Sequence, residues 1–393
     1  MIFTVFEDNN YNSLFPLNLN RASFELRCGA FTNLERIENL LQPNDSVQLI
    51  VRDELKPLIQ ERYPKYSINP EPLSPGIWLN GRALWFNEVL NGISAGKSYT
   101  SGGSVVAIHN QKEISLKDIH PYIEKAGSVS TALEIHQFKN IWDGIFLQSE
   151  IIKKDAHQFL DYKPGKVHPS VVLENGDNIY IGEGTEVRAG AVLDAKSGPI
   201  IIAENVYIDI GALIQGPVYI GPHCKINPGA KLRGNVTLGP MCKIGGEVED
   251  VIFQGYGNKQ HDGFLGHSYL GEWVNLGANT NNSDLKNNYS LIKLEVGDKK
   301  IETGKQFLGT MMGDYVRTGI STMLNTGTVI GLGANVFGEG FQEKYIPSFR
   351  WGKDSITKFD QFINTAEKMM ERRDKTMSQK EKIFLTDLYE KLI

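Results

Sequence analysis

The chain has few cysteines, no excess of positive charge and no long apolar run. Its 393 residues include only three cysteines, too few for a disulfide-stabilised secreted scaffold. Lysine and arginine number 41 against 46 acidic residues, a net charge of −5, whereas nucleic-acid binders usually carry a basic excess. No apolar run reaches the roughly 18 residues of a membrane span. We therefore expect neither a nucleic-acid partner nor a membrane partner.

The amino terminus also lacks a targeting pattern. Its first ten residues, MIFTVFEDNN, have no basic start and are acidic at Glu7 and Asp8, unlike a secretory signal peptide. Hydrophobic residues make up 41% of the chain, enough for sizeable cores, and the length suggests two or three domains. We therefore expect a cytoplasmic globular protein.

Glycine is the residue in excess, and it is spaced regularly. The chain has 40 glycines in 393 residues, against a usual share of about 7%. Most of them stand singly between residues 176 and 340 rather than in runs with proline and serine. Such spacing indicates a structural repeat rather than a disordered segment.

Aliphatic residues in the same region recur every six positions. The longest series is Ile202, Ile208, Ile214, Ile220, Ile226, Leu232, Leu238 and Ile244, and four positions after each stands a small or β-branched residue or a cysteine. A period of six fits neither an amphipathic helix nor a surface strand. It is typical of a parallel β-helix, in which three hexapeptides make one 18-residue coil and equivalent side chains stack inside. The pattern resembles the left-handed β-helix of hexapeptide-repeat acyltransferases, and the handedness rests on that resemblance.

The repeat divides the chain into three parts. Residues 1–165 alternate strand-like and helical stretches and predict an α/β domain, joined to the repeat by a linker at 162–169. Residues 166–346 predict the β-helix of about nine coils, interrupted by a polar loop at 281–306 that has room for a short hairpin. Residues 347–393 predict two helices, the second opened by a capping box at Ser378. We expect these helices to cover the open end of the β-helix, with an oligomer contact as the alternative.

The stretch from Gln260 to Thr280, QHDGFLGHSYLGEWVNLGANT, carries the chemical signal. It is similar to the acetyltransferase domain of the bifunctional N-acetylglucosamine-1-phosphate uridyltransferase/glucosamine-1-phosphate acetyltransferase family. Acetyl transfer to an amine needs a general base, and a histidine suits this at neutral pH. The resemblance implies His261 as that base and acetyl-CoA as co-substrate. It also implies roles in acceptor binding for Asn275, Phe264, Lys231, Arg233 and Lys305, and in coenzyme A binding for Ala278 and Arg350.

The same stretch departs from the family pattern at three places. Glu249 stands where the family commonly has a phosphate-binding lysine, and Phe264 replaces a tyrosine. Asp284 falls where the family has an asparagine. These changes bear on the identity of the acceptor sugar more than on acyl transfer. His267, six residues after His261, is interpreted as a structural or solvent-facing residue.

The amino-terminal part lacks the glycine-rich phosphate loop of ordinary sugar nucleotidyltransferases, because no glycine precedes Gly29. Its segments FPLNLNRASFELRCG and WLNGRALW instead resemble a divergent nucleotidyltransferase-like family fused to such β-helices in some bacteria. The resemblance implies nucleotide binding by Arg21, Arg27, Asn80 and Arg82. The alternative is that the arginines form structural ion pairs. Mg²⁺ is a possible cofactor, with Asp143 or Asp155 as candidates and the ligands otherwise unassigned.

The leading hypothesis is a sugar-phosphate acetyltransferase with a possible nucleotidyltransferase activity that uses UTP. Its product would be UDP-N-acetylglucosamine or a related nucleotide sugar, and the assembly a homotrimer. One alternative keeps the acyltransferase but makes the amino-terminal domain an inactive binding module. A second is a non-catalytic scaffold. A third, a metal-dependent hydrolyase resembling γ-class carbonic anhydrases, would need three converging histidines, for which His223, His261 and His267 are the candidates.

Overall fold

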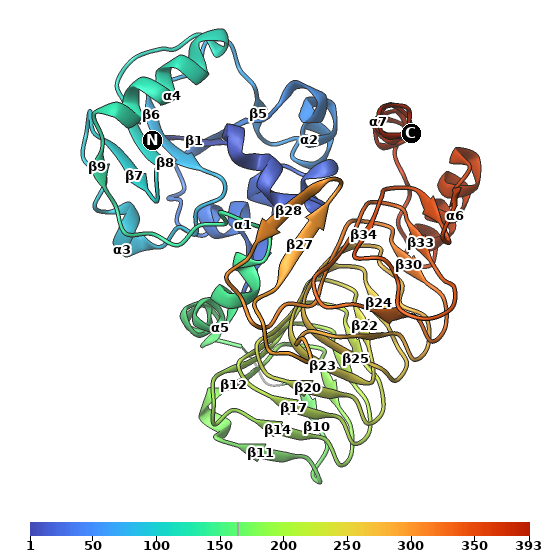
Figure 1. The fold of residues 1–393 in the computed structure, drawn as a ribbon. Helices are drawn as coiled ribbons and strands as arrows, with labels where there is room; N and C mark the ends of the chain where they lie inside the picture. Colours follow the sequence, from blue (N-terminus) through green and yellow to red (C-terminus); the bar gives the residue numbers. More distant parts are fainter. Residues whose placement is uncertain (163–164) are drawn as a thin grey trace.

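A computed structural model describes residues 1–162 and 165–393. Residues 163–164, in the expected linker, lie outside the described residues. The chain forms an α/β domain, a stack of β-helical coils and two carboxyl-terminal helices, as expected from the sequence (Figure 1). Among the described residues, no helix is both long and apolar enough to cross a membrane.

The amino-terminal domain is built on a mixed seven-stranded sheet. Its strands, in spatial order, are β5 (Ser67–Ile68), β4 (Ser46–Ile50), β1 (Ile2–Phe6), β6 (Gly76–Asn80), β8 (Ser104–Asn110), β7 (Ser98–Ser101) and β9 (Thr131–Ala132). Strands β5, β4, β1 and β6 run parallel, so their carboxyl ends meet at one edge. The helices of the domain are α1 (Asn33–Glu38), α2 (Lys56–Arg62), α3 (Asn87–Leu90), α4 (Ile119–Ser128) and α5 (Asp143–Asp155).

The expected helices of this domain are shorter in the structure. A capping box at Thr32 starts α1, whose Glu35 amide donates to the Thr32 hydroxyl. Of the helical stretch that the sequence favours at 84–90, only the last turn is helical, and it forms α3. The start of the stretch is not helical because Trp85 is buried and its indole donates to the Asn80 carbonyl at 3.2 Å. A short hairpin of β2 (Arg27–Cys28) and β3 (Phe31–Thr32) precedes α1.

The β-helix has three parallel faces, and successive coils add one strand or bridge to each. The first face contains β10 (Lys166–Val167), β13 (Glu186–Val187), β16 (Tyr207–Ile208), β19 (Lys225–Ile226), β22 (Lys243–Ile244) and β24 (Asn258–Lys259); it continues through single bridges at Asn275 to β30 (Arg317–Thr318), β33 (Asn335–Val336), β35 (Arg350–Trp351) and β36 (Ser355–Ile356). The second face contains β11 (Val172–Glu174), β14 (Val192–Asp194), β17 (Leu213–Gln215), β20 (Lys231–Arg233), the first parts of β23 (Glu247–Gly255) and β25 (Phe264–Glu272), β26 (Asn281–Asn282) and β31 (Met323–Leu324). The third face contains β12 (Ile179–Ile181), β15 (Ile200–Ile202), β18 (Val218–Ile220), β21 (Val236–Leu238), the last parts of β23 and β25, β29 (Thr310–Met312), β32 (Thr328–Ile330) and β34 (Tyr345–Ile346).

The six-residue period produces the stacking that the sequence predicts. Ile208 pairs with Ile226 and Ile226 with Ile244, each 18 residues apart. All eight members of the aliphatic series are buried in one core, together with the small residues four positions on. One coil breaks the rule, because Ile244 pairs with Lys259, whose side chain also lies inside and is 2% exposed.

Three corners join the faces of the β-helix. The first corner, between the first and second faces, contains His261 and Ala278. The second corner, between the second and third faces, contains Asp250 and His267. The third corner returns to the first face and contains Tyr256 and Trp273. Corner residues often have positive φ values, including Asp250 at 53°, Trp273 at 60° and His267 at 42°.

The polar loop contains the hairpin that the sequence allows. Strands β27 (Lys293–Val296) and β28 (Lys299–Glu302) pair antiparallel. The hairpin contributes Ile292 and Leu294 to a buried cluster that also holds Trp142 of the amino-terminal domain and Tyr269 of the third face. This cluster fixes the amino-terminal domain on the third face of the β-helix (Figure 1).

The carboxyl-terminal helices α6 (Phe359–Glu371) and α7 (Gln379–Leu392) pack along the third corner rather than only across an open end. Phe362 and Met370 of α6 lie in a buried cluster with Trp273, Tyr315 and Phe349. Helix α7 contacts α2, so the two helices bridge the β-helix and the amino-terminal domain. The large aromatic side chains at this corner explain the position, because they offer the helices an apolar surface.

Candidate functional site

The first corner holds the two residues that were expected to act together in acetyl transfer. His261 and Ala278 line one hollow of about 520 Å³ with Asn227, Gly245 and Asn279. The His261 side chain is exposed, and among residues 1–162 and 165–393 its ring makes no hydrogen bond or ion pair. The hollow is open, and no neighbouring carboxylate orients the imidazole.

The expected acceptor residues Lys231, Arg233 and Phe264 lie on the second face. Lys231 pairs with Glu247 and Glu247 with Phe264 in the strand register, so these three side chains form one column. Arg233 contacts Glu247 at 2.7 Å and Glu249 at 3.1 Å. Arg233 and Glu249 lie at the end of the second face that adjoins the second corner, whereas His261 lies at the first corner.

The second corner contains a histidine held by carboxylates. Nδ1 of His267 lies 2.8 Å from Oδ2 of Asp284, and its Nε2 lies 3.7 Å from Oδ2 of Asp250. An ionised carboxylate only accepts hydrogen bonds, so the bond to Asp284 fixes the proton on Nδ1 and leaves Nε2 with a lone pair. Asp284 lies 17 residues after His267, close to one 18-residue coil. That spacing is the sequence signal for the pair, and the interpretation of His267 as a structural or solvent-facing residue did not use it.

The ends of the polar loop and helix α5 surround His267. Phe307, where the loop returns, stacks on the imidazole with ring centroids 5.3 Å apart, and Phe146 of α5 lies 6.2 Å away. Lys305 was expected to bind the acceptor, and its Nζ lies 4.0 Å from the centroid of Phe146. The loop therefore brings Asp284, Lys305 and Phe307 to one histidine.

Burial and charge oppose one another at His267. Burial lowers its pKa, but the hydrogen bond that it donates to Asp284 and the charges of Asp250, Asp284 and Glu249 outweigh burial, so the pKa lies above the usual value for histidine. Burial raises the pKa of Asp250 against the charge of His267, and burial likewise raises that of Glu249 against Arg233.

The other two residues implied by the resemblance lie elsewhere. Asn275 is on the first face, where its Oδ1 accepts a hydrogen bond from Asn258 at 3.2 Å. Arg350 lies in β35 on the last part of the first face, and its guanidinium donates to the Lys353 carbonyl at 2.8 Å. Neither contacts His261 or His267.

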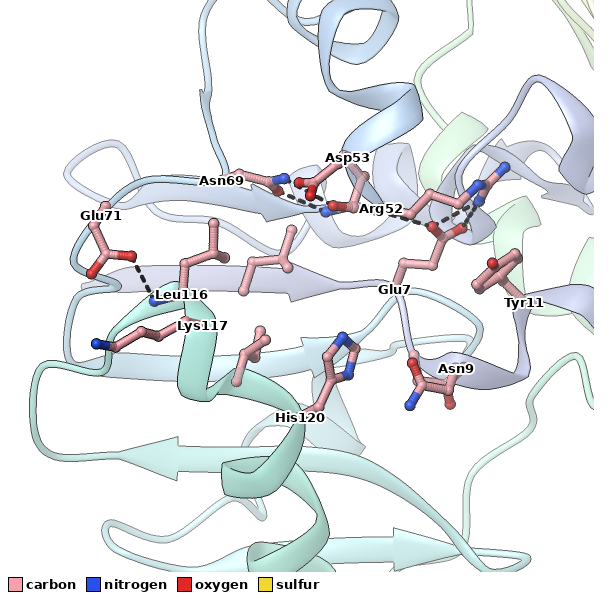
Figure 2. Close-up of a pocket in the computed structure, with 14 residues that line it drawn as sticks. Glu7, Asn9, Tyr11, Arg52, Asp53, Asn69, Glu71, Leu116, Lys117 and His120 are labelled. Atoms are coloured by element: carbon pink, nitrogen blue, oxygen red, sulfur yellow. Dashed lines mark hydrogen bonds and ion pairs between the residues drawn. The ribbon is translucent and has the colours of Figure 1, made fainter. Parts of the chain in front are cut away.

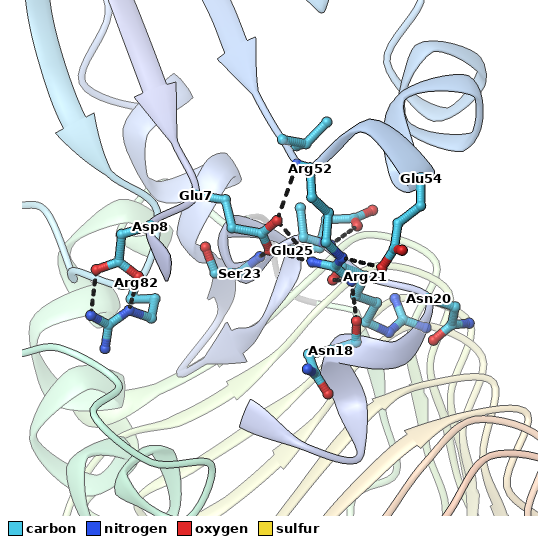
Figure 3. Close-up of polar contacts among 12 residues, drawn as sticks. Glu7, Asp8, Asn18, Asn20, Arg21, Ser23, Glu25, Arg52, Glu54 and Arg82 are labelled. Carbon is cyan, nitrogen blue, oxygen red and sulfur yellow. Dashed lines mark hydrogen bonds and ion pairs between the residues drawn. The ribbon is translucent and has the colours of Figure 1, made fainter. Parts of the chain in front are cut away.

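Arg21 and Arg27 are buried where the two domains meet. Arg21 pairs with Asp314 and, at 3.1 Å, with Glu272 of the β-helix, and it is 4% exposed (Figure 3 shows its surroundings). Arg27 donates to the Ala30 carbonyl at 2.5 Å and contacts Glu35 at 3.3 Å. Arg21 thus pairs across the two domains and Arg27 within its own domain, and both sets of contacts favour the alternative that the arginines form structural ion pairs.

Asn80 and Arg82 both bind Asp8, which follows β1. The Arg82 Nε donates to Asp8 Oδ1 at 2.8 Å, and the Asn80 amide donates to Asp8 Oδ2 at 2.9 Å (Figure 3 draws the Arg82 contact). The three residues follow β1 and end or follow β6, which lie side by side. Ligands of open α/β sheets bind outside the carboxyl ends of such strands, although Asp8 already uses the donors of Arg82.

A cavity of about 610 Å³ lies at the carboxyl ends of β1 and β4 (Figure 2). Glu7 and Arg52 pair at 2.7 Å on one side, and Lys117 and His120 come from the segment that starts α4. Burial raises the pKa of Glu7 despite Arg52. The cavity is large enough for a nucleotide-sized ligand.

The candidate aspartates do not provide a Mg²⁺ site. Asp143, the first residue of α5, accepts from the Lys139 and Asn140 amides of the preceding turn at 2.9 and 2.8 Å. Asp155 is 1% exposed and accepts from the Ala30 amide at 2.8 Å and from Arg36 at 3.0 Å. Within the described part of the chain, no three histidine, cysteine or acidic side chains are grouped to hold a metal ion. We therefore assign Mg²⁺ no ligands.

The three histidines required for a carbonic-anhydrase-like centre do not converge. His223 lies at the third corner, after β18, whereas His261 lies at the first corner and His267 at the second. Side chains at three different corners of the β-helix cannot bind the same ion within one chain.

Comparisons with known proteins agree with the two-domain organisation. Residues 3–161 match the family model "Sugar nucleotidyl transferase", and residues 199–234 match "Bacterial transferase hexapeptide (six repeats)". The expected combination of a nucleotidyltransferase-like domain with hexapeptide repeats is therefore confirmed.

Two curated relatives carry names from the same functional group. A bifunctional sugar-1-phosphate nucleotidylyltransferase/acetyltransferase of Sulfurisphaera tokodaii is 37% identical over 89 residues, 23% of this chain and 22% of the relative. The bifunctional protein GlmU of Methanocaldococcus jannaschii is 32% identical over 85 residues, 22% of this chain and 21% of the relative. The matches thus span about a fifth of the relatives' length.

Among solved structures, the polySia specific acetyltransferase NeuO matches 51% of this chain and 87% of its own. The identity is 13% and the TM-score 0.24. A likeness of this size carries no argument about function.

Proposed function

We propose that this chain, which joins a sugar nucleotidyl transferase domain to bacterial transferase hexapeptide repeats, transfers an acetyl group from acetyl-CoA to the amine of an amino-sugar phosphate. The observation that carries the proposal is the His267–Asp284 pair, with the expected acceptor residues Arg233 and Lys305 nearby. The names of the two relatives favour the same chemistry.

In this mechanism His267 is the general base. Asp284 holds the proton on Nδ1, so Nε2 takes the proton that the acceptor amine loses as its nitrogen attacks the thioester carbonyl. A bond forms between nitrogen and carbon, the carbon–sulfur bond breaks, and the thiolate leaves and is protonated. Asp250 and Glu249 give the corner a negative field that attracts the acceptor while it is still an ammonium ion.

Basic residues serve the phosphate of the acceptor. Lys231 and Arg233 on the second face and Lys305 above Phe146 are the expected cations, and Phe264 shares the column of Lys231. Asn275 on the first face is the further acceptor residue that the resemblance implies. His261 is the alternative base, supported by the hollow that it shares with Ala278.

The active assembly is a homotrimer in this proposal. The residue expected to bind the pantetheine arm, Ala278, lies at the first corner, and the acceptor residues converge on the second. One rigid prism cannot bring two of its own corners together, but the first corner of one copy can meet the second corner of the next around a threefold axis. Exposed apolar side chains at the first corner and on the second face support association, among them Ile210, Leu213, Ile320, Met323 and Phe341.

The amino-terminal domain is proposed to bind the nucleotide, UTP or a related triphosphate, in the cavity at the ends of β1 and β4. The matched family model supports sugar-1-phosphate nucleotidyl transfer, toward UDP-N-acetylglucosamine or a related nucleotide sugar. The contacts of Arg21, Arg27, Asn80 and Arg82 with the protein itself favour a scaffold role for these four residues over direct nucleotide contact. A domain that only binds is the alternative.

A mass-spectrometric screen tests both halves. The full chain is incubated with acetyl-CoA and a panel of amino-sugar phosphates, and then with UTP and Mg²⁺. An acetylated sugar phosphate with stoichiometric release of free thiol is expected, and a second mass shift on adding UTP would show nucleotidyl transfer. No acetylated product from any amino-sugar phosphate would contradict the acetyltransferase proposal. Product without the UTP-dependent shift would leave the amino-terminal domain as a binding module.

A further inference from the structure

A small basic cavity lies between the end of α6 and the first face, away from both histidines. Its volume is about 170 Å³, and Tyr256, Asn258, Trp273, Arg317, Arg372 and Arg373 contribute to its lining. Two of the arginines come from the end of α6 and the residues after it, and Arg317 comes from β30. The cavity thus joins two elements that are far apart in the sequence.

The positive charges around this cavity have no acidic partner. In the described ranges 1–162 and 165–393, none of Arg317, Arg372 and Arg373 forms an ion pair with a carboxylate. Lys243, on the same face, is also unpaired there, and burial together with the charges of Arg373, Arg372 and Lys225 lowers its pKa. Burial lowers the pKa of Arg317, and burial with the charge of Arg372 lowers that of Arg373. Arg373 is buried and Arg317 and Lys243 are half-buried, whereas Arg372 is exposed. Positive charge that is buried without an acidic partner, as at Arg373, is costly unless an anion accompanies it.

Two guanidinium groups have N–H donors without a hydrogen-bond acceptor among the described residues. Arg373 is 8% exposed, and its Nη2 donates to the Asn258 side chain at 2.7 Å. Its Nε is buried without a partner, and the Nε of Arg317 is in the same position. A buried donor without an acceptor loses its hydration and gains nothing in return. Both residues line the cavity, Arg317 from the first face and Arg373 from the segment after α6.

We propose that this cavity binds a phosphate group, held between the arginines of the α6 end and Arg317. The planar guanidinium fork matches the oxygens of phosphate, and a charge-assisted bond of this type is among the strongest in proteins. The stacked rings of Tyr256 and Trp273, with centroids 4.2 Å apart, form an apolar wall that strengthens the attraction. The volume is below that of a typical nucleotide site, so it accommodates a phosphate group but not a whole nucleotide.

The consequence is a ligand-dependent attachment of α6. A phosphate bound to Arg317 on one side and to Arg373 on the other links the helix end to the first face. The same helix packs Phe362 and Met370 on the third corner. Phosphate binding therefore stabilises the packed arrangement by mass action. Asn275, one of the expected acceptor residues, also lines this cavity, but the phosphate site is argued from the arginines alone.

Isothermal titration of the full chain tests the proposal. The probes are inorganic phosphate, an amino-sugar 1-phosphate and coenzyme A, with the unphosphorylated amino sugar as the negative control. Binding of inorganic phosphate that weakens with added NaCl is expected. Tighter binding of one organic probe, lost in the same variants, would identify a substrate phosphate as the source instead of the free ion.

The variants are Arg373→Gln and Arg317→Gln, and the control is Arg188→Gln, which changes a half-buried arginine at the far end of the first face that pairs with Glu186. Each cavity variant should lose about tenfold or more in affinity, and the control should lose none. Binding that is equal in all three variants, or no binding of any phosphate compound to the unmodified chain, overturns the proposal. Thermal unfolding with and without 10 to 100 times the dissociation constant of phosphate gives a second readout on the unmodified chain, in which a rise in Tm is expected and an unchanged Tm contradicts the proposal.

Discussion

Two corners of the β-helix carry histidines only six residues apart, yet their surroundings differ. At the first corner His261 is exposed in an open hollow beside Ala278. At the second corner His267 is bound to Asp284, lies near Asp250 and stacks on Phe307. The two imidazoles belong to one coil, so the difference comes from what is packed against that coil.

The contrast shows how a regular repeat becomes a site. Successive coils repeat the same kind of corner. The loop that leaves after Asp284 and returns at Phe307 makes one corner different, because it places these two side chains against His267. Helix α5 of the amino-terminal domain adds Phe146. Acid–base chemistry is thus favoured where irregular segments cover the repeat, because they supply orientation and exclude water.

The largest expected effect separates the two histidines directly. His267→Gln should reduce kcat for acetyl transfer by about a hundredfold to ten-thousandfold, the usual contribution of a general base. His261→Gln is the matched control and should retain most activity, because its ring has no carboxylate partner. Thiol release from acetyl-CoA measures both. The reverse result would move the base to the first corner.

Mixed assemblies test whether the two corners meet across copies. Ala278→Phe blocks the first corner and His267→Gln disables the second, so each variant alone should be inactive. In trimers formed from both chains, about a quarter of the interfaces would combine two intact corners, and activity should reappear. Light scattering should show three copies of the chain. Two inactive variants that stay inactive after co-assembly, in particles of trimer size, would count against a site between copies.

The Asp284→Asn variant sharpens the comparison through pH. Losing a charge-assisted bond worth about 1.5–3 kcal/mol should lower kcat by about tenfold to a hundredfold. The carboxylate raises the pKa of His267, so its loss lowers that pKa, and the basic form persists to lower pH. The acid limb of the kcat/KM profile should therefore move to lower pH. Glu249→Gln, which removes a more distant charge, should move it less.

The smallest expected effect concerns the first corner and the stability of the coil below it. Burial lowers the pKa of Lys259 to about 8, and its ammonium donates to the carbonyls of Gly245 and His261. The unfolded chain has a lysine pKa near 10.4 and binds more protons between these values. The free energy of unfolding should therefore rise with pH across that window, by about 2–3 kcal/mol.

Denaturant unfolding at pH 7.5 and pH 10 measures this, with each value taken relative to Lys259→Met, which has no titrating amine. Lys231→Met, on the exposed side of the second face, is the control and should behave like the unmodified chain. Equal pH dependence in the unmodified chain and the Lys259→Met variant would show that the buried amine does not carry the effect.

The β-helix was predictable because its signal is local and repeated. Each aliphatic residue of the series from Ile202 to Ile244 meets its equivalent one coil away, so spacing alone dictates the contact. The capping box at Ser378 marked a helix start for the same reason, because both partners lie within one turn. The hairpin in the polar loop also followed from composition, although its packing did not.

The site was less predictable, because its residues come from separate segments. Arg233, Lys305 and Phe264 were identified from a resemblance, but the sequence could not tell which histidine they accompany. Arg21 was expected to contact a nucleotide and instead pairs with Asp314, almost three hundred residues away. Such a pairing depends on how one domain docks on another, and no local pattern encodes it.

The amino-acid sequence by itself determined the period-six β-helix, the α/β domain before it and the helices after it, since each depends on neighbours within one turn, strand or coil. Only the tertiary structure decided which histidine has carboxylate neighbours and which arginines form ion pairs. Those outcomes depend on where the loop after Asp284, helix α5 and helix α6 come to lie. Burial and charge pairing are properties of that arrangement, and they set the pKa of His267 and the spare donors of Arg373.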